Sequence, residues 1–288
     1  MILLTGASGL VGRQTMAALL KAGHTVKALT SSQDSAKQLL SAGAQHTSVG
    51  NLRNEQDLRK AVKDVDTIIH IPPNIVEDEA EMGCRLVDVA EAAGIAHFVF
   101  MSCYHSHPAD IPSHHNKLLV EDALYRSNLN FTVLQPCMFM QNLELIWPQV
   151  ESSGVLAWPW SHQQKLAMID IEDVAQALSN VVGNLRFYGG TFELCSGDSL
   201  TVTEMAAILA IELQRPIRAD QLDAKEWVAH MSAQGFSPWT LANIMKMVSF
   251  FNDYGYRGGN SLSLRNILNR EPNHYSEYAK NFAQRLTK

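Results

Sequence analysis

Residues 2–12 read Ile-Leu-Leu-Thr-Gly-Ala-Ser-Gly-Leu-Val-Gly, and this run decides the fold class. It passes from a short apolar strand into a segment that carries Leu and Ala at helical spacing. Between the two, Gly6 can make a tight turn, Gly9 lets the backbone approach a pyrophosphate, and Gly12 lets the helix pack close to the sheet. The run therefore predicts a dinucleotide site in which the N-terminus of a helix holds the phosphates.

The first half of the chain alternates strand-like and helix-like segments. Strands are expected at residues 2–4, 25–29, 45–49, 67–71, 97–101 and 131–134. Helices are expected after them at residues 10–22, 35–42, 55–62, 79–93 and 113–127. Mostly apolar strands that each precede a helix predict an α/β fold of the Rossmann type, with a doubly wound parallel sheet covered on both faces.

After Pro136 the alternation ends. Helices are expected at 138–150, from about 172 to 182, and at 205–213, 224–234, 238–252 and 275–285. Residues 190–195 are expected to form a strand, residues 155–160 a short strand or a loop, and residues 254–262 a loop.

These segments predict two regions. Residues 1–150, rejoined by residues 165–196, are expected to form one dinucleotide-binding Rossmann domain. Residues 151–164 and 197–288 are expected to form a smaller, mostly helical cap that binds substrate.

Composition excludes several classes of protein. The chain has 288 residues, of which 46% are hydrophobic and 18% charged, which is typical of a globular protein and not of a disordered one. The formal net charge is -6 and no Lys/Arg run is present, so we expect no binding to nucleic acid or to an anionic membrane surface. No apolar stretch is long enough to span a membrane, and we expect no signal peptide, because Thr5-Gly6 follows a short apolar run without a basic segment. The four cysteines form no Cys-x-x-Cys pair, which favours a cytoplasmic protein with reduced thiols.

The end of the second expected strand indicates which cofactor is bound. NAD sites usually place Asp or Glu there, but residues 29–32 read Leu-Thr-Ser-Ser. Arg13 follows the third glycine and could reach a 2′-phosphate, and Ser31 leaves room for that phosphate. Arg53 or Lys37 could add charge, although each by itself is expected to be a solvated surface residue. We expect NADP (NADPH) as the cofactor in preference to NAD.

Over nearly its whole length the sequence resembles the NmrA-like group of atypical short-chain dehydrogenases, with a pattern of the type 2 quinone oxidoreductase kind. The motifs that carry the resemblance are Thr5–Gly12, Gly50-Asn51, Ile71-Pro72-Pro73, residues 97–102, residues 112–117, Leu134-Gln135-Pro136, residues 139–142 and Asp170–Val174. That group includes quinone reductases, benzylic ether reductases and dinucleotide-sensing regulators. The resemblance therefore implies the fold and NAD(P) binding, and it names no substrate.

The resemblance also implies contacts to the cofactor. The residues that would line the pyrophosphate are Gly6, Ser8, Gly9, Leu10 and Val11, within a turn that Ala7 and Gly12 complete. The residues that would lie along the adenosine and ribose are Ile71, Pro72 and Pro73, and those near the nicotinamide are Pro136, Cys137 and Met138. Lys117 would hold the nicotinamide ribose. Asn51 stands where the group commonly has Asp, and Asn can still bond the adenine amino group.

The proton donor of most short-chain dehydrogenases is missing. Those enzymes use Tyr-x-x-x-Lys, but Ser113 stands four residues before Lys117. Three substitutes are open: His114, which titrates near neutral pH, Tyr104, and Lys117 itself. Each has an alternative role without proton transfer: a structural hydrogen bond at the helix start for His114, the aromatic wall of a pocket for Tyr104, and ribose binding for Lys117. Ser102 could contact cofactor or substrate, or simply cap its strand.

The histidines near this motif do not have the spacing of a metal site. Four of them lie at positions 105, 107, 114 and 115, but none forms an i, i+4 pair. We therefore expect no metal.

Aromatic side chains suggest the kind of substrate. The candidate substrate residues are Tyr104, Phe139, Trp158, Trp160 and Phe251, and ordinary core packing is the alternative for each. Together they favour a small planar or apolar, electron-poor substrate such as a quinone, enone or imine. Two functions follow: an NADPH-dependent reductase, or a non-catalytic NADP(H) redox sensor that binds a protein partner. A homo-oligomer is compatible with either.

Overall fold

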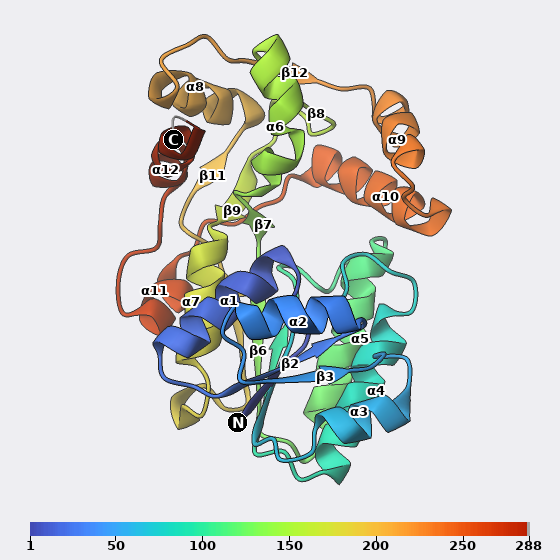
Figure 1. Cartoon of the computed structure of the whole chain (residues 1–288). Coiled ribbons are helices and arrows are strands. Elements are labelled where there is room, and N and C mark those ends of the chain that lie inside the picture. The colour runs from blue at the N-terminus through green and yellow to red at the C-terminus, as the bar shows by residue number, and fades with distance from the viewer. Residues whose placement is uncertain (287–288) are drawn as a thin grey trace. The chain divides into compact units, whose positions relative to one another are not determined.

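A seven-stranded sheet organises the first part of the chain (Figure 1). Its strands in spatial order are β10 (Gly190–Leu194), β6 (Phe131–Pro136), β5 (His97–Met101), β4 (Thr67–His70), β1 (Ile2–Leu4), β2 (Val26–Thr30) and β3 (His46–Val49). The five pairings from β6 to β3 are all parallel. The chain order reverses between β1 and β4, so the carboxyl ends of these strands flank the switch point at which doubly wound folds bind ligands.

Helices cover the sheet because the strands are apolar on both faces. The helices of this part of the chain are α1 (Leu10–Lys21), α2 (Gln33–Ser41), α3 (Glu55–Ala61), α4 (Glu79–Ala92), α5 (Pro112–Arg126), α7 (Ile171–Asn180) and the single 3₁₀ turn η1 (Leu185–Phe187). Leu3, Ile68 and Phe98 are fully buried in a core that also contains side chains of α3, α4 and α5. Each of the strands and helices expected in residues 1–134 is present, and the predicted Rossmann-type fold is confirmed.

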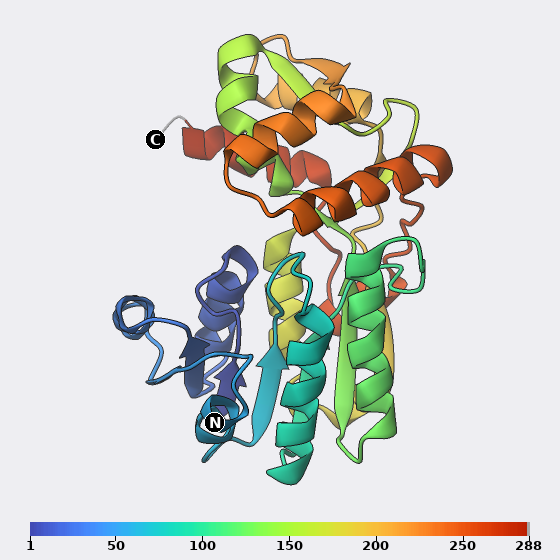
Figure 2. The same ribbon diagram turned by 90° about the vertical axis from the view of Figure 1, so that its right-hand side faces the viewer.

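Two adjacent helices pack unusually closely. Figure 2 shows α4 and α5 side by side on the sheet. A Cβ atom on Gly83 of α4 would lie 2.5 Å from Val120 Cγ2 of α5, closer than two carbon atoms can approach. The absence of a side chain at Gly83 therefore sets the spacing of the two helices.

The structure describes residues 1–286 and divides the chain into two compact units. Unit 1 comprises Met1–Pro136, Glu172–Glu193 and Ile267–Asn269, and unit 2 comprises Cys137–Ile171, Leu194–Asn266 and the residues from Arg270 onward. The first segment of unit 1 thus ends at Pro136 and not at the expected residue 150. The reason is that Met138 and Phe139 pair with β9, a strand of unit 2, and the helix that follows them belongs to unit 2 as well.

Unit 2 contains two small sheets and several helices. Its strands are β7 (Met138–Phe139), β8 (Val155–Trp158), β9 (Leu166–Ile169), β11 (Ser199–Leu200) and β12 (Arg218–Gln221), in the orders β11-β9-β7 and β12-β8. Its helices are α6 (Asn142–Ser153), α8 (Val202–Glu212), α9 (Ala224–Ala233), α10 (Pro238–Tyr254), α11 (Leu262–Leu268, which runs into unit 1) and α12 (Tyr275–Leu286). Among residues 1–286, no helix is long and apolar enough to cross a membrane.

Two expectations for the second half were wrong in detail, and one that left two alternatives open is decided. The helix expected at 138–150 begins only at Asn142, because Met138 and Phe139 form β7. The segment 155–160, expected as a short strand or a loop, contains the short strand β8, which pairs with the unexpected strand β12. The segment 254–262 is not wholly a loop, because Tyr256 bridges to Leu166 of β9. These strands have two to four residues and therefore too few alternating positions to reveal themselves in sequence.

The α4–α5 contact generates a prediction. Gly83→Ala should lower the free energy of unfolding by roughly 1–3 kcal/mol, because the new methyl group meets Val120. Val120→Ala alone also destabilises by leaving a cavity, but in the double variant the new methyl group fills part of that cavity. Urea unfolding of the two single variants and the double variant should therefore give non-additive losses. Strict additivity would contradict the packing argument.

Candidate dinucleotide-binding site

The turn between β1 and α1 is shaped by backbone contacts that exclude side chains. Gly6 has φ +66°, and a Cβ atom there would lie 2.6 Å from Ile71 O. A Cβ atom on Gly12 would lie 2.0 Å from Gly6 O, so the first turn of α1 rests directly on the preceding turn. A Cβ atom on Gly9 would meet only Gly6 O, at 3.3 Å. The protein itself thus requires glycine most strongly at the first and third positions, whereas Gly9 leaves backbone accessible to a ligand, as a pyrophosphate site requires.

The N-terminus of α1 is suited to an anion. Gly9 is the N-cap and supplies no side-chain acceptor, and the first turn contains no acidic residue. Ser8, Gly9 and Leu10 are exposed, so the first amide groups of α1 lie at the surface of unit 1. Exposed N–H groups at the positive end of a helix favour phosphate. The turn therefore fits the pyrophosphate that the sequence predicted.

A threonine ties this turn to the neighbouring strand. The Thr5 hydroxyl accepts a hydrogen bond from Ile71 N at 3.1 Å and lies 2.8 Å from His70 Nδ1. His70 is fully buried, and burial lowers its pKa to about 3, an effect that the charge of Lys117 strengthens. Neutral His70 and Thr5 thus fix the course of Ile71, and Pro72 and Pro73 follow it half-buried. Neither Thr5 nor His70 was expected from the sequence to have a role of its own, although Thr5 lies inside the motif.

The carboxyl end of β2 carries hydroxyl groups and no acid. Ser31 is exposed, and Ser32 caps α2 by accepting a hydrogen bond from Ser35 N at 3.1 Å. Arg13, in the first turn of α1, donates from Nε to Ser8 O at 2.9 Å, which directs its guanidinium along the turn. A cation beside the turn and a strand end without an acid suit a 2′-phosphate better than a free ribose diol.

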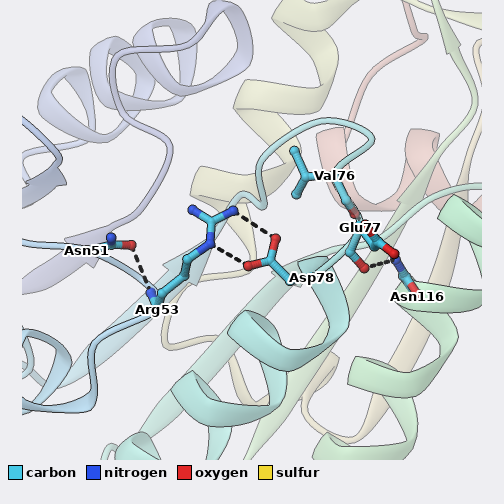
Figure 3. Close-up of polar contacts among 6 residues, drawn as sticks. All are labelled: Asn51, Arg53, Val76, Glu77, Asp78 and Asn116. Carbon is cyan, nitrogen blue, oxygen red and sulfur yellow. Dashed lines mark hydrogen bonds and ion pairs between the residues drawn. The ribbon is translucent and has the colours of Figure 1, made fainter. Parts of the chain in front are cut away.

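Asn51 and Arg53 belong to a polar network at the end of β3 (Figure 3). Asn51 Oδ1 accepts a hydrogen bond from Arg53 N at 2.9 Å, so one acceptor position of the amide is already used. Arg53 forms a two-pronged ion pair with Asp78, which holds the pKa of that carboxyl below its ordinary value. Asn116 of α5 donates to Val76 O at 3.4 Å and to the carbonyl of residue 77 at 3.2 Å. Arg53 is thus committed to Asp78, which leaves Arg13 as the stronger candidate for the 2′-phosphate.

Lys117 lies on α5 in a buried ion pair. Its ammonium contacts Glu79 Oε1, and the side chains are 12% and 1% exposed respectively. Ser113, at the position of the usual tyrosine, is buried one turn earlier. His114 Nδ1 lies 2.7 Å from His105 O, and burial lowers the pKa of His114 to about 4, although that hydrogen bond opposes the shift. His114 is therefore neutral at pH 7 and carries its proton toward a backbone carbonyl, which disfavours it as a proton donor.

Ser102 and Tyr104 occupy different surroundings at the end of β5. The Ser102 hydroxyl donates to Glu121 of α5, and Gln135 Nε2 donates to the same carboxylate at 2.9 and 3.1 Å. Ser102 is thus engaged within unit 1. Tyr104 is 4% exposed, and its ring centroid lies 3.8 Å from that of His105.

Of the remaining predicted residues, Pro136 is the buried last residue of β6 in unit 1, and the others lie in unit 2. Cys137 is buried, its amide donates to Leu194 O at 3.0 Å, and burial with the neighbouring Cys195 raises its pKa. Met138 and Phe139 are half-buried in β7, and Trp158 is buried at the end of β8. The rings of Trp160 and Phe251 lie 6.1 Å apart. The structure therefore brings the last two together within unit 2. Among residues 1–286, leaving aside the side chain of residue 230, no group of three or more His, Cys, Asp or Glu is arranged to hold a metal ion.

Comparison with known proteins agrees with this geometry. The model of the NmrA-like family matches residues 1–279. The chain belongs to the NmrA-like family. The resemblance in the sequence is thereby confirmed.

Proteins to which the chain is similar carry names from redox chemistry. The chain is 27% identical over 282 residues to the NAD(P)H azoreductase of Xenophilus azovorans, which covers 97% of both proteins. The NADPH complex of quinone oxidoreductase QOR2 from Escherichia coli superposes with a TM-score of 0.85 at 20% identity, covering 98% of this chain and 99% of the other. The NADP(H) complex of Citrobacter triphenylmethane reductase gives a TM-score of 0.85 at 20% identity, covering 98% of this chain and all of the other. At this identity the two structures show a common fold.

The buried histidines of this NmrA-like chain predict a loss of stability in acid. In the unfolded chain His114 takes up a proton below about pH 6.5, whereas in the folded protein it does so only near pH 4. The free energy of unfolding should therefore fall as pH drops through this window, by roughly 2 kcal/mol for this group between pH 7 and pH 5. Urea unfolding of His114→Gln, which keeps a donor for His105 O, should show that much less acid sensitivity than the wild type. An imidazole of His114 that titrates near pH 6.5 in NMR spectra would refute the burial argument.

Proposed function

We propose that the chain binds NADP(H) at the β1–α1 turn and reduces a small, apolar, electron-poor substrate. The observation that carries the proposal is the turn itself: Gly6 and Gly12 are required by backbone contacts, and Gly9 leaves the uncapped start of α1 open to a pyrophosphate. Membership of the NmrA-like family, and relatives named azoreductase, quinone oxidoreductase and triphenylmethane reductase, support both parts.

The chain's own residues have distinct tasks in this proposal. The bound cofactor supplies the hydride. The amides at the start of α1 hold the pyrophosphate, with Gly6, Ala7, Ser8, Gly9, Leu10, Val11 and Gly12 forming the turn. Arg13 and Ser31 receive the 2′-phosphate, and Asn51 faces the adenine as hydrogen-bond partner. Ile71, Pro72 and Pro73 flank the adenosine, Pro136, Cys137 and Met138 flank the nicotinamide, and Lys117 bonds the nicotinamide ribose.

The proton that the reduced substrate takes up has three candidate sources, namely Tyr104, Lys117 and a water molecule. Neutral His114, with its Nδ1 proton directed at His105 O, is a poor acid, and Ser102 is engaged by Glu121. Tyr104 and Lys117 remain candidates, together with a water molecule. A water donor suits substrates such as quinones, whose reduced forms take up protons readily.

Substrate recognition is proposed for Tyr104 and for four residues of unit 2, which are Phe139, Trp158, Trp160 and Phe251. Large flat side chains favour planar substrates through ring contacts. The class of substrate that follows is a quinone, an enone, an imine or an azo compound.

A second function is favoured by one specific observation. Ser113 stands in place of the usual tyrosine, and the adjacent His114 is neutral, so neither of these two residues of α5 replaces the usual proton donor at neutral pH. The alternative is a non-catalytic NADP(H) sensor that binds a protein partner according to the redox state of the cofactor.

The test of function separates these two proposals. The purified protein is titrated with NADPH and NADP⁺, and the absorbance of NADPH is then followed with a panel of quinones, enones and azo dyes. The reductase proposal expects turnover with at least one class. No turnover together with a large difference in affinity between NADPH and NADP⁺ would favour the sensor, and no binding of either would overturn both.

The position of Arg13 beside the turn predicts a preference for NADPH over NADH. Arg13→Gln should weaken NADPH binding by roughly 10- to 100-fold, because one charge-assisted contact to the 2′-phosphate is lost, and should leave NADH binding unchanged. Arg126→Gln, an exposed substitution at the last residue of α5, is the matched control and should change neither. Fluorescence titration measures both affinities. An equal loss for NADPH and NADH would place Arg13 elsewhere than at the 2′-phosphate.

The pairing of the Trp160 and Phe251 rings predicts that the substrate binds beside Trp160. Trp160→Leu should raise KM for a quinone several-fold, because a half-buried ring next to Phe251 is removed, while the Kd for NADPH stays unchanged. Steady-state kinetics and a cofactor titration of the same preparation make the comparison. A parallel loss of both affinities would indicate a purely structural ring.

A further inference from the structure

The ion pair between Glu79 and Lys117 is buried between two helices. Glu79 is the first residue of α4, and Lys117 lies in the middle of α5. Gly83 follows Glu79 by four residues and Val120 follows Lys117 by three, so the glycine contact that draws the helices together lies directly beside the pair. The close approach of α4 and α5 therefore lets a short acidic side chain reach the ammonium group.

Three titratable groups that feel the charge of Lys117 carry no charge themselves at neutral pH. His70 of β4 and His114 of α5 feel the charge of Lys117, and burial holds their pKa at about 3 and about 4. Cys103, after β5, also faces it, and burial raises the pKa of that thiol to about 12. Glu121, one turn further along α5, is bonded by Ser102 and Gln135. Among the described residues, Glu79 is thus the carboxylate that forms an ion pair with Lys117.

The carboxylate of Glu79 is incompletely satisfied. Its Oε2 is buried and has no hydrogen-bond partner among residues 1–286. Burial raises the pKa of Glu79, and the charge and hydrogen bond of Lys117 oppose that shift. A buried ion pair of this kind commonly stabilises a protein less than apolar residues of the same size would. The pair therefore calls for an explanation other than fold stability.

We infer that Glu79 is a positioning residue for Lys117. Its carboxylate keeps the ammonium group charged and directs it by accepting a hydrogen bond from one of the three N–H groups. The other two N–H groups then remain for the nicotinamide ribose, a step that rests on the proposed function. The role predicts that loss of the negative charge, more than loss of side-chain volume, disturbs Lys117.

The first experiment examines the protein without cofactor. Lysine side chains are labelled by reductive ¹³C-methylation, and the signal of Lys117 is assigned through Lys117→Arg. In Glu79→Gln the midpoint of its titration should fall by about one pH unit or more, because a buried ammonium loses its counter-ion. Glu81→Gln, an exposed substitution on the same helix, should leave the midpoint where it is in the wild type. An unchanged midpoint in Glu79→Gln overturns the inference, whatever the function of the protein.

The second experiment examines cofactor binding. The Kd for NADPH is measured from pH 6 to pH 10 for the wild type, Glu79→Gln and Glu79→Asp. Glu79→Gln should lose roughly tenfold or more in affinity toward alkaline pH, where Lys117 loses its proton earlier, and Glu79→Asp should recover part of that affinity. A lower melting temperature with an unchanged dependence of Kd on pH would mean a structural role only.

The two arms separate the possible failures. If the wild type binds no NADPH, the proposed function fails, but the NMR titration still decides whether Glu79 sets the charge of Lys117. If Glu79→Gln does not fold, Glu79→Met, which also removes the charge and keeps a similar volume, replaces it in both arms with the same criterion.

Discussion

The first turn of α1 packs directly on the turn before it, because Gly12 has no side chain to hold the two apart. The same turn passes close to the carbonyl of Ile71, which requires the positive φ of Gly6. The Thr5 hydroxyl then joins the ends of β1 and β4 at the switch point of the sheet. These contacts direct the free amides of α1 to the edge of the sheet at which doubly wound folds bind ligands. The rest of the candidate site is arranged around that point.

The positively charged side chains of the candidate site differ in their partners. Arg13 lies on the surface of the turn, whereas Arg53 is neutralised by Asp78. Deeper in unit 1, burial keeps His70 and His114 neutral, and the ion pair of Lys117 with Glu79 lies near these uncharged side chains. In such surroundings an ammonium group is screened weakly and acts strongly on whatever binds near it.

Local pattern was sufficient to predict the sheet and the glycine turn. Most strands of unit 1 are largely apolar runs of three to six residues followed by helices, and the spacing of Gly6, Gly9 and Gly12 has a direct steric meaning. In unit 2 the strand β8 was expected as one of two alternatives, whereas β7 and β11 were missed because they have two residues each and are defined only by their pairing with β9. For the same reason the boundary between the units was expected at residue 150, inside α6, and not before β7.

The candidate site divides in the same way. The sequence by itself determined the phosphate-binding turn, the absence of an acid at the end of β2, and the absence of a tyrosine before Lys117, since each depends on residues close together in the chain. Only the tertiary structure decided that Arg53 is paired with Asp78, that His114 is neutral, and that Glu79 meets Lys117. The two ion pairs join residues that are 25 and 38 positions apart in the chain, and the state of His114 depends on its burial and on the carbonyl of His105. No local pattern in the sequence carries that information.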